Sequence, residues 1–131
     1  MTVQLSAAVL AQMVAHAREE APRECCGLLI GKRGVVESAV RVHNLETGST
    51  RFLIDPQEHF AAIKTARSRG LRVIGAYHSH PKGETTPSES DIAEASGGAD
   101  FLSVIVSPAG ERATGYFVKN GRVVFAELVE T

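Results

Sequence analysis

Two histidines at alternate positions, His78 and His80, close an apolar run in the segment GAYHSHPKGETTPSESDI (residues 75–92). Side chains alternate between the two faces of a strand, so both imidazoles are expected to point the same way. The Pro- and Gly-containing loop that follows favours a chain reversal that returns Asp91 toward them. Two neutral nitrogens and one carboxylate suit Zn²⁺, and three protein ligands leave a position for water. The segment therefore predicts one catalytic zinc ion per chain, bound by His78, His80 and Asp91.

Hydrolysis at such a centre also requires a general base and a hydrogen-bond donor for the developing oxyanion. Glu24 is the leading candidate for the base, because an acid at the start of the apolar run CCGLLIG has little packing value. Ser88 is the candidate donor, three residues before Asp91. A structural interpretation competes with this one, since Ser88 and Asp91 also have the spacing of a helix N-cap. A lone HxH pair in a strand is likewise often only half-buried histidine.

The remaining titratable and thiol side chains favour structural roles. His43 and His59 are expected at the solvated surface, and His16 is expected to be partly exposed on a helix. Tyr77 should face away from the histidines into the core, while Cys25 and Cys26 should behave as buried apolar residues.

Composition restricts the class of protein. The 131 residues fit one domain, residues 1–131, and 44% hydrophobic residues are enough for a core. The formal charge of -1 and the lack of a basic stripe argue against a nucleic-acid partner. The N-terminal segment is too interrupted by polar residues for a membrane helix, and the two adjacent cysteines are poorly placed for a disulfide. We expect a soluble, reduced, cytoplasmic protein.

The predicted elements alternate between helices and strands. Residues 6–20 have helical spacing with Ser6 as N-cap, and residues 55–70 form a helix with Asp55 as cap, Pro56 at its first position and Glu58 completing a capping box. A short helix is expected over 88–96, ended by Gly97-Gly98. Strands are predicted at CCGLLIG, VVESAVRVHN, RFLID, LRVIGAYHSH, FLSVIVSP, TGYFVK and RVVFAELV, with hairpin turns at Arg33-Gly34 and Asn120-Gly121. This pattern predicts an α/β fold with a single mixed sheet flanked by helices.

The order of these residues resembles the JAMM (MPN+) metalloprotease motif. The stretch HSHPKGETTPSESD matches the pattern HSHx7SxxD without a departure, and PRECCGLLIG looks like the segment that carries the family's catalytic Glu. FLIDPQEHFAAIKTARSRGLRVIGAYHSHP is similar to the family's usual sequence before the motif, so the likeness extends over about residues 4–119.

The resemblance implies an MPN/JAB1 fold related to cytidine deaminases, with His78, His80 and Asp91 as zinc ligands. Glu24 would then deprotonate the water, and Ser88 would polarise the scissile carbonyl or stabilise the tetrahedral intermediate. It further implies hydrolysis of the bond after the C-terminal Gly-Gly of a ubiquitin-like or sulfur-carrier protein. The short chain is typical of a prokaryotic member, without the insertions of deubiquitinating relatives. The carrier, its attached group and the oligomeric state stay open.

Three other functions have less support in the sequence. A non-catalytic MPN-type scaffold that binds partner proteins would be expected to lack a metal ligand, and none is missing here. A deaminase-like zinc hydrolase would carry HxE and PCxxC signatures, which do not occur in this sequence. A DNA-repair-associated relative would typically read HNHP and carry a helical DNA-binding region, and the chain has HSHP and no such region.

Overall fold

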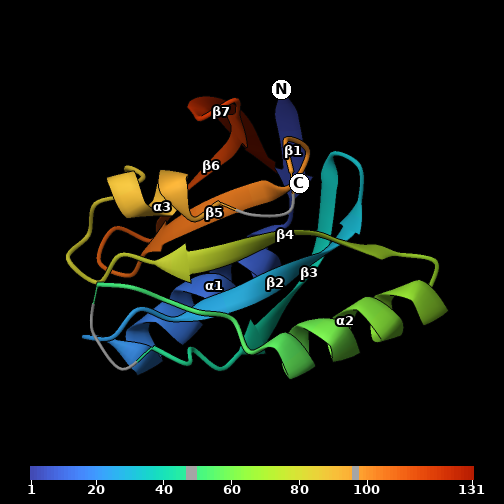
Figure 1. Ribbon diagram of the computed structural model, residues 1–131, viewed down its shortest axis with the longest axis horizontal. Coiled ribbons are helices and arrows are strands. Elements are labelled where there is room, and N and C mark those ends of the chain that lie inside the picture. The colour runs from blue at the N-terminus through green and yellow to red at the C-terminus, as the bar shows by residue number, and fades with distance from the viewer. Residues whose placement is uncertain (47–49, 96–97) are drawn as a thin grey trace.

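The computed structural model describes residues 1–46, 50–95 and 98–131. Within these residues, seven strands and three helices follow one another along the chain (Figure 1). The strands are β1 (Thr2–Leu5), β2 (Cys26–Lys32), β3 (Val35–Val42), β4 (Arg72–Ser79), β5 (Leu102–Ser107), β6 (Arg112–Lys119) and β7 (Arg122–Glu130). The helices are α1 (Ala7–Glu20), α2 (Pro56–Ser68) and α3 (Glu89–Ala93).

The strands form one mixed sheet in the order β1-β3-β2-β4-β5-β6-β7, and β1 closes it into a barrel by pairing with both β3 and β7. Pairing is parallel between β4 and β5 and on both sides of β1, and antiparallel elsewhere. The α/β fold with a mixed sheet is therefore confirmed. The strand β1 and the closure it produces were not predicted, because four residues before a helix carry too little pattern.

Strand β2 lies in the centre of the packing, between the two long helices. Its side chains alternate, so Cys25 and Leu29 pack with α1 in one buried cluster. Cys26, Leu28 and Ile30 face the other side and pack against Ala62 and Ala66 of α2. Both cysteines are free and fully buried, and burial raises the pKa of the Cys25 thiol to about 11 and that of Cys26 to about 12. They are apolar core residues, as expected, since a thiol with so high a pKa is unreactive at neutral pH.

Local capping chemistry sets the helix ends. The Ser6 hydroxyl accepts a hydrogen bond from the Val9 amide at the start of α1, and the Asp55 carboxylate accepts one from the Gln57 amide at the start of α2. The predicted capping box of α2 is wrong in one respect. Glu58 turns away from the cap, accepts a hydrogen bond of 2.7 Å from the His43 amide and contacts the His43 ring.

Three further predictions are corrected by the structure. Residues 51–55 form no full strand and contribute only an isolated bridge between Asn44 and Ile54. The third helix ends at Ala93, before Ser96 and Gly97, which lie outside the described residues. His16 is buried rather than partly exposed. Its Nδ1 atom lies 2.7 Å from the Tyr77 hydroxyl, and this hydrogen bond offsets the desolvation of the buried ring nitrogen.

Among the described residues, no helix is long and apolar enough to cross a membrane.

Candidate metal centre

Strand β4 delivers the two histidines of the motif from the middle of the sheet. It is paired with β2 on one side and β5 on the other, so its backbone is fixed by two ladders. His78 is buried at the end of this strand, and the ring of Phe52 stacks on its imidazole with centroids 4.4 Å apart. His80 follows directly after β4, and its amide donates to the carbonyl of Val106 in β5. The sheet thus fixes the position of both rings.

Asp91 reaches the histidines from α3, across the Pro- and Gly-containing loop. Its Oδ2 atom lies 3.0 Å from Nε2 of His80, its Oδ1 atom lies 3.3 Å from Nε2 of His78, and the two imidazole nitrogens are 3.2 Å apart. Zinc ligands at about 2.0–2.2 Å in tetrahedral geometry lie roughly 3.3–3.5 Å from one another. The three side chains therefore form a candidate metal site, a triangle whose separations of 3.0–3.3 Å are close to, and slightly shorter than, those around a tetrahedral zinc ion.

The charges of the three side chains suit a cation. Burial alone would raise the pKa of Asp91, but hydrogen bonds from His78 and His80 hold this pKa well below its usual range, so the carboxylate is ionised. Burial lowers the pKa of His78 despite its contact with Asp91. Burial also opposes the charged form of His80, yet the hydrogen bond and charge of Asp91 raise its pKa overall. A metal ion would displace the proton from His80, because a ligating imidazole must be neutral.

Glu24 lies next to this triangle. The register that pairs Cys26 with His78, continued by the hydrogen bond of 3.1 Å from the Ser79 amide to the Cys25 carbonyl, places Glu24 opposite His80. The side chain is 5% exposed, and its Oε1 atom is buried without a hydrogen-bond partner among the described residues. A buried carboxylate oxygen left without a donor is costly and fits a position that a water or another ligand would satisfy.

Burial raises the pKa of Glu24 to about 7, with the nearby Asp91 adding to the rise and His80 opposing it. A carboxyl group with this pKa can both accept and release a proton near neutral pH, which is the property a general base and acid needs.

This shift predicts a pH dependence of stability in the metal-free chain. The pKa of Glu24 is about 7 when folded and 4.5 in its unperturbed form, so the folded state binds more protons between these values and stability falls as the pH rises. Glu24→Gln removes the cost of ionisation and should stabilise the chain at pH 8, but not at pH 4.5, by on the order of 2–3 kcal/mol. Urea unfolding of both proteins with chelator present measures this. A difference that stays constant with pH would contradict the raised pKa.

Ser88 has the capping role that the sequence allowed. Its hydroxyl accepts a hydrogen bond of 3.0 Å from the Asp91 amide, and the Ser88 amide donates to Asp91 Oδ2 at 2.9 Å. The Asp91 carboxylate therefore belongs both to the capping box of α3 and to the candidate metal site. The Ser88 hydroxyl is also 3.2 Å from the Ser90 hydroxyl. Its own hydrogen is not committed to the cap, which leaves it available as a donor.

A hollow of about 400 Å³ opens beside His78 and Asp91. Phe52, Leu53 and Ile54 line one side of it, and Glu94 of the segment after α3 forms an ion pair with Arg51 across it. The sequence did not reveal this role for Phe52, which was expected in an ordinary strand. The sequence shows only that an aromatic residue occurs in the apolar pattern of RFLID, and this pattern does not indicate what the ring contacts.

The family model of prokaryotic homologues of the JAB domain (Prok-JAB) matches residues 6–118, a span that includes the triangle, Glu24 and Ser88. The chain belongs to the Prok-JAB family. The chain is also similar to solved structures. A solution structure of a protein from Desulfitobacterium hafniense matches with a TM-score of 0.89 and 30% identity, over 99% of this chain and 93% of the other. A JAB1/MPN domain protein from Archaeoglobus fulgidus matches with a TM-score of 0.65 and 25% identity, over 98% of each chain.

Several curated relatives of this Prok-JAB chain have named activities. A probable TtuB-protein conjugate cleaving protease of Thermus thermophilus is 40% identical over 88 residues, which span 66% of this chain and 59% of the relative. The desampylase of Haloferax volcanii is 33% identical over 105 residues and 75% of each protein. The CysO-cysteine peptidase of Mycobacterium tuberculosis is 33% identical over 82 residues, 61% of this chain and 56% of the relative. The matched part is thus little more than half of two of these proteins.

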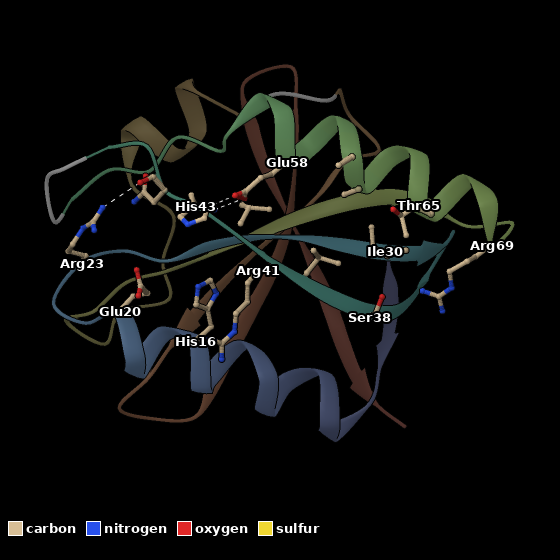
Figure 2. A pocket seen from close by; sticks show the side chains of 16 residues that line it. His16, Glu20, Arg23, Ile30, Ser38, Arg41, His43, Glu58, Thr65 and Arg69 are labelled. Atoms are coloured by element: carbon tan, nitrogen blue, oxygen red, sulfur yellow. Dashed lines mark hydrogen bonds and ion pairs between the residues drawn. The ribbon is translucent and has the colours of Figure 1, made fainter.

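A second hollow of the Prok-JAB chain, about 540 Å³ in volume, lies between α1, β3 and α2 (Figure 2). It contains His16, His43 and Glu58 but none of the three residues of the triangle. His43 is exposed, as predicted, and pairs with Glu58, whose hydrogen bond raises the pKa of the imidazole. His59 instead lines the smaller hollow beside the triangle.

Proposed function

We propose that this chain is a zinc-dependent metallopeptidase that hydrolyses the bond after the C-terminal Gly-Gly of a ubiquitin-like or sulfur-carrier protein. The observation that carries the proposal is the triangle of His78, His80 and Asp91 with the unpartnered carboxylate of Glu24 beside it. Membership of the Prok-JAB family supports the substrate class, as do relatives named a probable TtuB-protein conjugate cleaving protease, a desampylase and a CysO-cysteine peptidase.

In this proposal His78, His80 and Asp91 would hold one Zn²⁺, which when bound would supply a water of lowered pKa, about 7, and a Lewis acid for the scissile carbonyl. Glu24 accepts a proton from the attacking water through its unpartnered oxygen. The water oxygen bonds to the carbonyl carbon of the terminal glycine, and Glu24 returns the proton to the leaving amine as the C–N bond breaks. The hydroxyl of Ser88 donates a hydrogen bond to the oxygen that becomes negative, a contact that often contributes about 10²–10³ in rate.

The hollow beside the triangle fits an extended chain end. Its lining includes His78 and Asp91 together with apolar side chains, such as Phe52 and Leu53, and the charged pair of Arg51 and Glu94. A terminal Gly-Gly lacks side chains and can approach the metal ligands closely, which a larger residue could not do. We therefore favour a carrier tail over an internal loop of a folded protein as the substrate.

The test uses a ubiquitin-fold sulfur carrier extended past Gly-Gly by one residue, incubated with the zinc-loaded chain and followed by mass. We expect loss of the added residue, and a chelator should stop this loss. A matched carrier ending in Ala-Ala before the same residue should be cleaved much more slowly. Zinc bound in stoichiometric amount without cleavage of any extended carrier would contradict the proposed substrate, and failure to bind zinc would contradict the mechanism.

A further inference from the structure

The register of β2 with β4 places Glu24 opposite His80 but does not include Glu24 in the ladder. The ladder of β2 begins at Cys26, two residues later, so Glu24 lies before the regular pairing. Its backbone is held instead by polar groups on two sides. On one side, Ser79 holds the next residue, Cys25. The Ser79 amide donates a hydrogen bond of 3.1 Å to the Cys25 carbonyl, and the Ser79 hydroxyl accepts one of 2.8 Å from the Cys25 amide. On the other side, the Asn44 carboxamide donates to the Glu24 carbonyl at 3.0 Å.

The Asn44 side chain has four hydrogen-bond partners. Besides the Glu24 carbonyl, its nitrogen donates to the Arg51 carbonyl at 3.1 Å. Its oxygen accepts the amides of Glu46 at 3.0 Å and Leu53 at 2.9 Å. A carboxamide offers two donor hydrogens and two acceptor lone pairs, so every one of them is used here. Four hydrogen bonds from one side chain to four different residues fix the Asn44 carboxamide in one orientation.

These partners belong to two different parts of the site. Arg51 and Leu53 lie on the segment that lines the hollow beside His78 and Asp91. Glu24, which is not part of that lining, carries the unpartnered carboxylate beside the triangle. One side chain therefore connects the wall of the hollow to the residue that faces the metal ligands.

Arg23 strengthens the same connection from the neighbouring position. Its guanidinium donates to the Glu46 carbonyl at 2.8 Å and to the Asn44 carbonyl at 3.4 Å, and Figure 2 shows it reaching toward this segment. The two segments 23–24 and 44–46 are therefore joined in both directions. The Arg23 side chain bonds to backbone carbonyls of the second segment, and the Asn44 side chain bonds to a backbone carbonyl of the first.

We propose that Asn44 is a positioning residue, which fixes Glu24 at the metal centre and ties it to the wall of the hollow. The inference rests on the proposed function, because it needs Glu24 to act as the base. The carboxamide nitrogen, its donor half, bonds to the carbonyls of Glu24 and Arg51. The carboxamide oxygen, its acceptor half, bonds to the amides of Glu46 and of Leu53 in the wall of the hollow. Loss of the donor half lets the Glu24 carboxylate move away from the water it must deprotonate, and a displacement near 1 Å can cost about 10²-fold in rate.

Asn44→Asp separates the two halves, because aspartate keeps the acceptor oxygen for Glu46 and Leu53 but has no hydrogens for the carbonyls of Glu24 and Arg51. We expect kcat to fall by about 10–100-fold, as for other residues that orient a metal site, with KM near the wild-type value and zinc still stoichiometric. Asn120, the only other asparagine, lies in the hairpin turn between β6 and β7. Asn120→Asp makes the same chemical change outside the hydrogen bonds that join Glu24, Asn44 and Arg51, and should leave kcat unchanged.

Asn44→Ala checks that the added charge is not the cause. It also removes the acceptor half, so kcat should fall as in the aspartate variant while KM rises, because the wall is released. Thermal melts show whether each variant is folded. A kcat for Asn44→Asp equal to that of Asn120→Asp would overturn the inference, as would a rise in KM alone. Absence of cleavage by the unsubstituted chain would instead overturn the proposed function, and this inference with it.

Discussion

Glu24→Gln should abolish turnover of the extended carrier while the chain still binds one zinc ion. Glutamine keeps the size of the side chain but cannot accept a proton, and general base catalysis is typically worth about 10²–10⁴-fold in rate. Zinc should stay bound because the three candidate ligands, His78, His80 and Asp91, contact one another without Glu24. Single-turnover cleavage followed by mass, beside zinc analysis of the same preparation, measures both quantities.

The matched control is Glu89→Gln, which removes the charge of an exposed acid on α3, two residues from Asp91. It should have a rate close to that of the unsubstituted chain. A near-normal rate for Glu24→Gln would exclude Glu24 as the base. Loss of zinc in Glu24→Gln would instead make Glu24 a metal ligand. The greater stability expected for the metal-free variant at pH 8 shows independently that any loss of activity is not a loss of folding.

The parts of the fold that the sequence predicted are those determined by neighbours along the chain. Ser6 and Asp55 cap their helices because a side-chain oxygen needs only an amide two or three residues away. The turn at Asn120-Gly121 follows from two residues at positive φ, which Asn and Gly tolerate. Partners distant in sequence decided the exceptions. Glu58 had the spacing for its cap and bonded to His43 instead.

The site shows the same division between local and distant information. His78 and His80 share a face because of the strand period, and Asp91 returns because of the loop composition. Nothing in the sequence near Glu24 indicates that its carboxylate oxygen is left unpartnered, because that depends on the antiparallel register of β2 and β4. His16 likewise has an ordinary helical pattern, and only the packing of α1 against Tyr77 makes it a buried hydrogen-bonded residue.

Asp91→Ala should lose most of the bound zinc and, with it, the activity. Asp91 supplies the only carboxylate of the triangle, and its charge stabilises a cation that two neutral imidazoles hold less well. We expect the zinc affinity to fall by more than the roughly 10–100-fold that follows loss of an outer hydrogen-bond partner. Competition with a chelator measures the affinity, and cleavage of the extended carrier measures the activity.

Because Asp91 also closes the capping box of α3, a loss of zinc could arise from a damaged helix start. Ser88→Ala tests this, since it removes the other half of the box and should cost about 1 kcal/mol of stability. Asp91→Asn keeps an oxygen that can accept from the Ser88 amide but removes the charge. If Asp91 is a ligand, both Asp91 variants lose zinc and Ser88→Ala keeps it. If Asp91 is only a cap, Asp91→Asn retains zinc and Ser88→Ala resembles Asp91→Ala, because the box then matters and the charge does not.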